Sequence, residues 1–149
     1  MIRNVLVAVD GSENSDRALD FGLDLAEKYV ATVNVLNVIE SPAMGAVPLE
    51  PTTVSGESMV VFTKDLQKIH EEILRKAINH AKEVKPNIVV SSKLREGDPA
   101  LEIVAEVKDA GFDVVVVGHR GLSRVEEIFL GNISEKVAHL ATCPVVIVR

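Results

Sequence analysis

The sequence is poor in cysteine and in aromatic residues. Its 149 residues include one cysteine, Cys143, and no tryptophan, and aromatic side chains make up 3% of the chain. A single cysteine excludes an internal disulfide and fits a reducing compartment. With so few aromatic rings, the 47% of residues that are hydrophobic must build an aliphatic core. The length suits one domain, residues 1–149, with one core.

Positive charge is also scarce relative to negative charge. The chain carries 16 lysines and arginines against 22 aspartates and glutamates, for a formal net charge of -6. Nucleic acids and anionic membranes both attract clustered basic surfaces, so we expect neither as a partner. The first hydrophobic run, residues 5–9, ends at Asp10 and is too short for a signal peptide or a membrane helix. We expect a cytoplasmic protein.

Five short hydrophobic runs predict strands. They are rich in β-branched residues, and most lack the alternation of a half-buried strand, which indicates parallel strands covered on both faces. The runs are residues 5–9, 33–39, 88–90, 114–117 and 145–148. Asn34 and Asn37 interrupt the second run.

Helical patterns separate these runs, at residues 15–29, 65–84, 99–110 and 133–141. Asp98 and Pro99 form an N-cap and first helical residue for the third helix, and Gly111 ends it. The alternation of strand and helix predicts an α/β fold of the doubly wound class, with helices on both faces of the sheet. Such sheets bind ligands at the carboxyl ends of their strands, here just after Val9 and Val117.

Residues 41–63 are the one long stretch without a regular pattern, because prolines and glycines recur through it. Its length favours a mobile flap or a partner surface. A disordered surface loop is the alternative interpretation.

The fourth strand leads into a turn with the chemistry of a phosphate site. Gly118-His119-Arg120-Gly121 follows the strand, nine residues intervene, and Gly131-Asn132-Ile133-Ser134 opens the last helix. Glycines let backbone N–H groups approach an anion closely, and a helix N-terminus offers N–H groups and a positive dipole end. The alternative is that the glycines only form turns, with Asn132 as N-cap and Glu135 completing a capping box.

Few charged side chains surround this turn. Arg120 and Arg124 are the basic groups placed to meet a phosphate, unless they are solvated arginines. His119 lies inside the turn, where its backbone is expected to matter more than its ring. His70 and His80 have charged neighbours and are expected on a solvated helix face. No two histidines and a carboxylate have metal-ligand spacing, so no structural metal is predicted.

Asp10 follows the first strand and faces the expected crevice. Its carboxylate can accept hydrogen bonds from ribose hydroxyls or from an adenine amine. The alternative is an Asx turn that caps the first helix together with Ser12.

Three segments in this order resemble the universal stress protein family over nearly the full length of the chain. They are the first strand and turn at 5–12, the spacing Gly118-x-x-Gly121-(nine)-Gly131, and the closing segment 141–149. The spacing is similar to that of the family's ATP-binding branch. The resemblance implies a Rossmann-like five-stranded parallel sheet of order 3-2-1-4-5. It also implies binding of ATP, or of ADP or AMP, with Mg²⁺ as an optional companion of the phosphates.

The resemblance also assigns expected roles to matching residues. Asp10, with Ala8 and Val9 beside it, matches the acidic residue near adenine and ribose, and Val38 matches an adenine-pocket position. The ribose and phosphate turns are matched by Gly118, Gly121, Gly131, Asn132, Ile133 and Ser134. The family usually has Ser or Thr where this chain has Asn132, whose amide can still donate a hydrogen bond.

Three function classes compete on these observations. The first is a nucleotide-dependent regulatory protein of the stress response, without catalysis. The second is a slow ATP hydrolase or an adenylyl-transfer enzyme of related fold, although only Glu126 and Glu127 in the intervening loop are spare carboxylates near the turn. The third is a phospho-acceptor domain of the response-regulator type. We set the third aside because it needs an aspartate where the third strand is expected to end, at Ser91-Ser92-Lys93.

The last strand predicts a homodimer. Residues 145–148 are all hydrophobic, and in the family's strand order they lie at a sheet edge, which a second copy of the chain would cover. Cover by residues 41–63 is the alternative. The lone Cys143 is expected to be a buried small residue without a base beside it.

Overall fold

The computed structural model describes residues 1–40, 56–120 and 131–149, and the side chains of these residues except those of 56–62. The elements are β1 (Asn4–Ala8), α1 (Glu13–Tyr29), β2 (Thr32–Glu40), α2 (Gly56–Val84), β3 (Val90–Gly97), α3 (Pro99–Ala110), β4 (Val114–Gly118), α4 (Asn132–Leu140) and β5 (Val145–Val148).

The described strands form one parallel sheet of five strands in the order β3-β2-β1-β4-β5. The expected α/β fold and its strand order are therefore confirmed. Response-regulator sheets have the order 2-1-3-4-5, so the order also excludes that class.

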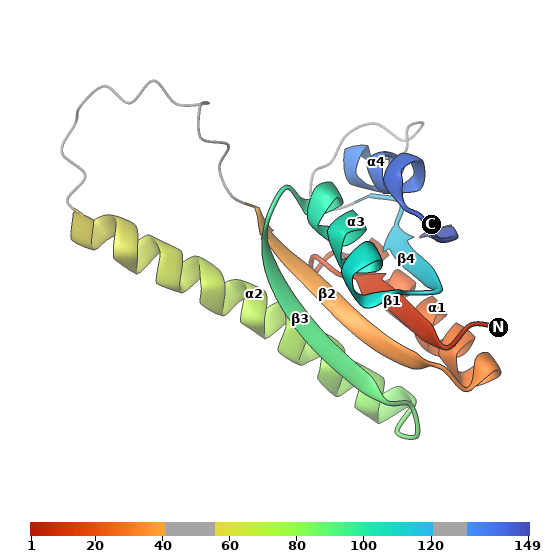
Figure 1. Cartoon of the computed structure of the whole chain (residues 1–149). Coiled ribbons are helices and arrows are strands. Elements are labelled where there is room, and N and C mark those ends of the chain that lie inside the picture. Colours follow the sequence, from red (N-terminus) through yellow and green to blue (C-terminus); the bar gives the residue numbers. More distant parts are fainter. Residues whose placement is uncertain (41–55, 121–130) are drawn as a thin grey trace.

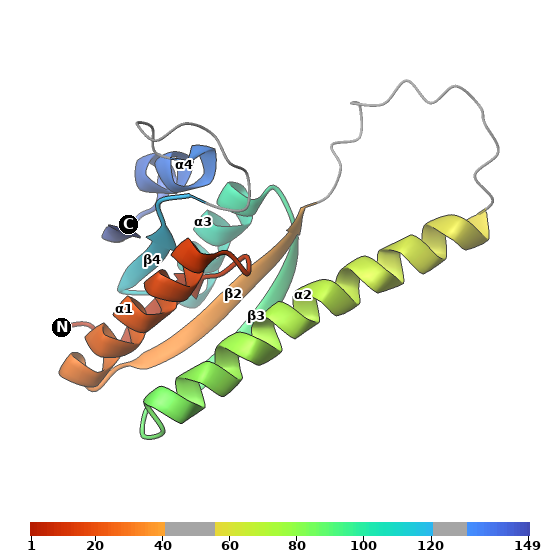
Figure 2. The ribbon, with the colours of Figure 1, turned by 180° about the vertical axis from the view of Figure 1, so that it is seen from behind.

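In the described part of the chain, α1 and α2 cover one face of the sheet and α3 and α4 cover the other (Figures 1 and 2). On one face, Val5 and Val7 pack with Leu19 and Leu23 of α1 and with Leu74 of α2. On the other face, strand residues pack beneath α3 and α4; this cluster includes Leu6, Leu36, Ile103, Val115 and Val137. The alternation of side chains along each strand supplies both clusters from the same short runs.

Two elements have a boundary that differs from the predicted one by more than two residues. The helix expected at 65–84 begins at Gly56, so residues 56–63 belong to α2, and the rest of the irregular stretch, 41–55, lies outside the described residues. The strand expected at 88–90 runs from Val90 to Gly97. The sequence did not reveal the full length of β3 because most of its residues are polar. They are polar because β3 is an edge strand whose side chains contact charged groups of α3.

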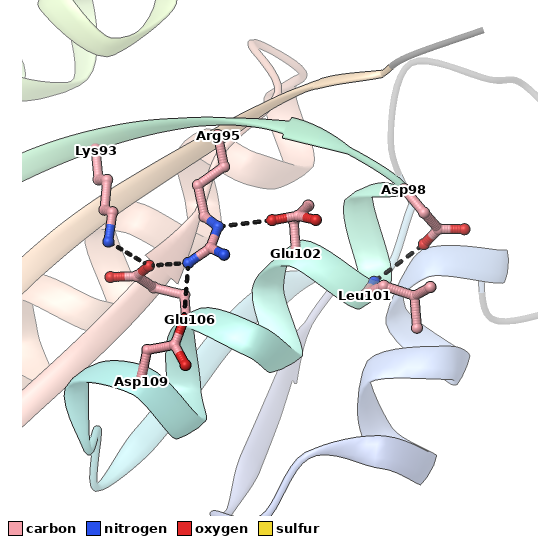
Figure 3. A network of polar contacts seen from close by, with 7 residues as sticks. All are labelled: Lys93, Arg95, Asp98, Leu101, Glu102, Glu106 and Asp109. Carbon is pink, nitrogen blue, oxygen red and sulfur yellow. Dashed lines mark hydrogen bonds and ion pairs between the residues drawn. The ribbon is translucent and has the colours of Figure 1, made fainter. Parts of the chain in front are cut away.

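Figure 3 shows the polar network that joins β3 to α3. The Glu106 side chain is only 2% exposed, and it lies 2.7 Å from Lys93 Nζ and 2.6 Å from Arg95 Nη1. Arg95 Nε also donates to Glu102 Oε2 at 2.7 Å. Burial acts to raise the pKa of Glu106, but the hydrogen bonds from Lys93 and Arg95 outweigh it, so the pKa is lowered. The network holds α3 against the edge strand with a buried anion that is paired.

Among the described residues, no helix is long and apolar enough to cross a membrane.

The junction between α1 and β2 contains a strained residue. Val30 ends α1 in the left-handed conformation, with φ of 56°, and it is the only described non-glycine residue with positive φ. The following N–H, that of Ala31, donates to Ala26 O at 2.8 Å, as in a helix C-cap that usually carries glycine. Val30 is 93% exposed, so no packing offsets the strain.

We expect Val30→Gly to raise the free energy of unfolding by about 0.5–1 kcal/mol. Relief of left-handed strain is worth about 1–2 kcal/mol, and the greater freedom of glycine in the unfolded chain offsets part of it. Urea denaturation would measure the change. The control Val30→Ala keeps a Cβ and should gain less than the glycine variant. A glycine variant less stable than the wild type would contradict this account of the junction.

Candidate functional site

A cavity of about 390 Å³ lies at the carboxyl edge of the sheet. It is lined by the end of β2 and by the first turns of α3 and α4, namely Glu40, Asp98, Pro99, Ala100, Asn132, Ile133 and Lys136. Its size falls in the range of small-molecule sites. Two predicted site residues, Asn132 and Ile133, line this cavity.

The turn between β1 and α1 holds Asp10 in a fixed orientation. Asp10 Oδ1 accepts a hydrogen bond from Ser12 N at 2.9 Å, and Ser12 Oγ caps α1 by accepting from Ser15 N at 3.2 Å. Gly11 between them has φ of 83°, which favours glycine. The Asx turn considered as an alternative is therefore present.

The turn after β4 is closed by backbone hydrogen bonds. His119 N donates to Val148 O at 2.7 Å, and Gly131 N donates to His119 O at 2.8 Å. The hydroxyl of buried Ser134 lies within hydrogen-bond distance of both His119 O and Gly131 O, at 3.0 and 2.9 Å. His119 thus acts here through its backbone. The Ser134 hydroxyl is engaged with the turn itself rather than pointing to a ligand.

Both described glycines of this turn permit close backbone approach. A Cβ on Gly118 would lie 2.9 Å from the backbone carbonyl group of Asn14 in α1. A Cβ on Gly131 would lie 2.9 Å from His119 O. A bulky residue at Gly131 would therefore strain the turn itself, so it would not be a clean probe of ligand binding.

The alternative interpretation, in which Asn132 is the N-cap of the last helix, was wrong by one residue. Gly131 occupies the cap position, with no side-chain cap hydrogen bond, and Asn132 is the first helical residue. The close contact with His119 O excludes a side chain at the cap, so glycine stands there. The exposed Asn132 side chain is not the cap and lies at the cavity instead.

The other predicted site residues lie around the same edge of the sheet. Ala8 and Val38 are partly buried against the core beneath α3 and α4, and Val9 is buried on the opposite face. Arg120 is half-buried at the end of the described turn. Gly121, Arg124 and the carboxylates Glu126 and Glu127 lie outside the described residues.

The sequence reasoning missed a buried polar chain that begins at Val9, the residue before Asp10. Asn37 in β2 is 1% exposed, and its Nδ2 donates to Val9 O at 2.6 Å. Its Oδ1 contacts His70 Nδ1 of α2, so His70 Nδ1 must carry the donated proton. The prediction of a solvated His70 was therefore wrong. Partial burial lowers the pKa of His70, whereas His80 contacts Asp20 at an exposed position.

No group of three or more histidine, cysteine, aspartate or glutamate side chains that could hold a metal occurs in the described part of the chain. Burial raises the pKa of the half-buried Cys143 thiol, which disfavours the reactive thiolate.

We expect Asn37→Leu, which keeps the number and branching of the side-chain heavy atoms, to lower the free energy of unfolding by about 1–3 kcal/mol, because Val9 O and His70 Nδ1 both lose a partner. Denaturation curves would measure the loss. The control His70→Phe keeps the bond to Val9 O and should cost less than Asn37→Leu. An equal or larger cost for His70→Phe would show that the bond to Val9 O contributes little.

Comparison with known proteins identifies the relatives of this chain. The family model described as "Universal stress protein family" matches residues 1–149. The universal stress protein YxiE of Bacillus subtilis is 33% identical over 156 residues, covering 100% of both chains. A universal stress protein of Methanothermobacter thermautotrophicus is 39% identical over 153 residues, covering 100% of this chain and 97% of the relative.

Solved structures share the fold. Universal stress protein UspA from Lactobacillus plantarum superposes with a TM-score of 0.80 at 18% identity, covering 99% of this chain and 98% of that one. A universal stress protein family protein from Arabidopsis thaliana, solved with AMP bound, gives a TM-score of 0.69 at 23% identity, with coverage of 98% and 90%. The chain belongs to the universal stress protein family.

Proposed function

We propose that this chain binds adenine nucleotides, ATP in particular, and acts as a nucleotide-dependent regulatory protein rather than as an enzyme. The observation that carries the proposal is the cavity at the carboxyl edge of the sheet, which is bounded by the first turn of α4. Solved universal stress proteins with AMP and with cAMP support the ligand class.

The phosphates would bind at the first turn of α4. The structure gives this turn no side-chain cap, so its N–H groups are suited to an anion, and the dipole of the helix adds to the attraction. Backbone groups of Gly131, Asn132, Ile133 and Ser134 would therefore carry most of the phosphate contacts. Any Mg²⁺ would be held mainly by the phosphates themselves.

The nucleoside would bind nearer to the ends of β1 and β2. Asp10 would accept hydrogen bonds from the ribose or the adenine amine, beside Ala8 and Val9. Val38 would contact the adenine ring. Gly118, His119, Arg120 and Gly121 would border the ribose and phosphates.

Calorimetric titration with ATP tests the proposal. We expect a dissociation constant in the micromolar range, which corresponds to a binding free energy of about -8 kcal/mol.

The variant Asn132→Pro tests the role of the backbone N–H group at the first turn of α4. Proline is well tolerated at the first helical position but removes the N–H group there. The extended conformation of Gly131, with ψ of 146°, suits the residue before a proline. We expect Asn132→Pro to weaken ATP binding about tenfold, roughly the loss of one charge-assisted hydrogen bond.

The control Asn132→Ala keeps the N–H group and should bind ATP almost as the wild type does. No binding of any adenine nucleotide by the wild type would refute the proposal. Hydrolysis faster than about one per second, within the ordinary enzyme range, would favour the alternative of an ATP hydrolase.

We also propose that the chain forms a homodimer through β5. This strand is at one edge of the described sheet, and its four hydrophobic residues are each only partly buried. An uncovered hydrophobic edge invites pairing with a second copy about a two-fold axis.

We expect Val146→Pro to shift the protein from dimer to monomer in sedimentation velocity experiments, because proline removes a donor from the strand and is disfavoured in a paired sheet. The control Val89→Pro changes an exposed residue that precedes β3, at the opposite edge of the sheet, and should stay dimeric. A wild type that is monomeric at high micromolar concentration would rule out the dimer.

A further inference from the structure

An ion pair joins α3 to α4 across the wall of the cavity. Lys136 Nζ lies 2.9 Å from Asp98 Oδ2, and both residues line the cavity. The other carboxylate oxygen, Asp98 Oδ1, accepts from Leu101 N at 3.0 Å and so caps α3. Asp98 is therefore fixed by its own helix, whereas Lys136 is attached by a flexible four-carbon chain.

The position of Lys136 on α4 places it beside the proposed phosphate site. It follows Asn132 by four residues and Ile133 by three, and residues at these spacings share one helix face. All three line the same cavity. The ammonium group can therefore reach an anion bound at the first turn of α4.

The charges that line the cavity are unbalanced. Among the described lining residues, Glu40 and Asp98 are acidic and Lys136 is the single basic one. Hydrogen bonds from Lys136 and from Leu101 N lower the pKa of Asp98, so Asp98 is an anion at neutral pH. A phosphate that enters this cavity would be repelled by two carboxylates and attracted by one ammonium group.

We propose that Lys136 contacts the phosphates of a bound nucleotide and leaves Asp98 to do so. The affinity of the chain for a nucleotide would then depend on the number of its phosphates. This inference rests on the proposed function. Lys136 favours the polyanionic ligand, and Asp98 competes with that ligand for the same ammonium group. The side chains of Lys136 and Asp98 are 42% and 46% exposed, so the exchange needs no unfolding of either helix.

Two variants that break the same ion pair distinguish a phosphate-binding role of Lys136 from a purely structural role. Lys136→Met should weaken ATP binding about tenfold and AMP binding less, because the attraction is lost and two carboxylates remain. Asp98→Asn keeps a good N-cap residue but removes the competitor and one repulsive charge, so ATP binding should tighten several-fold. If the ion pair were purely structural, both variants would change the affinity for ATP in the same direction.

The experiment is calorimetric titration of the full chain with adenosine, AMP and ATP. Lys108→Met is the matched control, since Lys108 is in the last turn of α3, at the opposite end from Asp98. The inference is supported if the affinity for ATP changes in opposite directions in Lys136→Met and Asp98→Asn while both still bind adenosine as the wild type does. The control Lys108→Met should bind ATP with the wild-type affinity.

Three results would overturn the inference while leaving the proposed function in place. They are unchanged ATP binding in Lys136→Met, shifts of both pair variants in one direction, or an equal loss in Lys108→Met. Absence of ATP binding by the wild type would remove the proposed function itself.

Discussion

The parallel pairing of β1 with β2 on one side and β4 on the other is the contact on which the site depends. Val7 is in register with Val35 and with Val116, so the three strands run side by side to the same edge. The residues that follow them, Asp10 after β1 and His119 after β4, are thereby brought together although they are far apart in the sequence. In a parallel sheet this edge also receives the N-termini of the following helices, whose partial positive charge suits an anionic ligand.

The position of each helix N-terminus depends on a different contact. The buried Glu106 and its partners Lys93 and Arg95 hold α3 against the edge strand β3. The start of α4 is held by the bond between Gly131 N and His119 O, which only a residue without a Cβ permits at this distance. The Asp98–Lys136 ion pair then joins the two helices across the cavity. The cavity is thus bounded by the first turns of α3 and α4, which this pair of charges joins.

The fold could be predicted because the central strands are short runs of β-branched residues that are buried on both faces. The same logic failed at β3, where Ser91, Lys93 and Arg95 face solvent or charged residues of α3, so the strand has no hydrophobic run to reveal it. The start of α2 was predicted too late because Gly56 is within a stretch of prolines and glycines. Edge position and contacts with α3, which the sequence does not display, decided the case of β3.

The sequence indicated where the candidate site residues gather but not how they bond to one another. The glycine spacing and Asp10 pointed to the edge of the sheet at which the cavity lies. The cap at Gly131 depends on its distance to His119 O, and the role of His70 depends on its contact with Asn37. Both contacts join residues that are distant in sequence, so no local pattern reports them. The interruption of a buried strand by Asn37 was the only available signal, because a buried amide requires partners.

Mapping of amide chemical shifts during titration with ATP tests the central claim most directly, because it locates the ligand without any substitution. The account predicts saturable shifts of Gly118, His119, Ile133 and Ser134, with little change at Val30 and Val89 near the amino ends of β2 and β3. Shifts confined to that opposite end of the sheet, or no shifts at millimolar ATP, would contradict it.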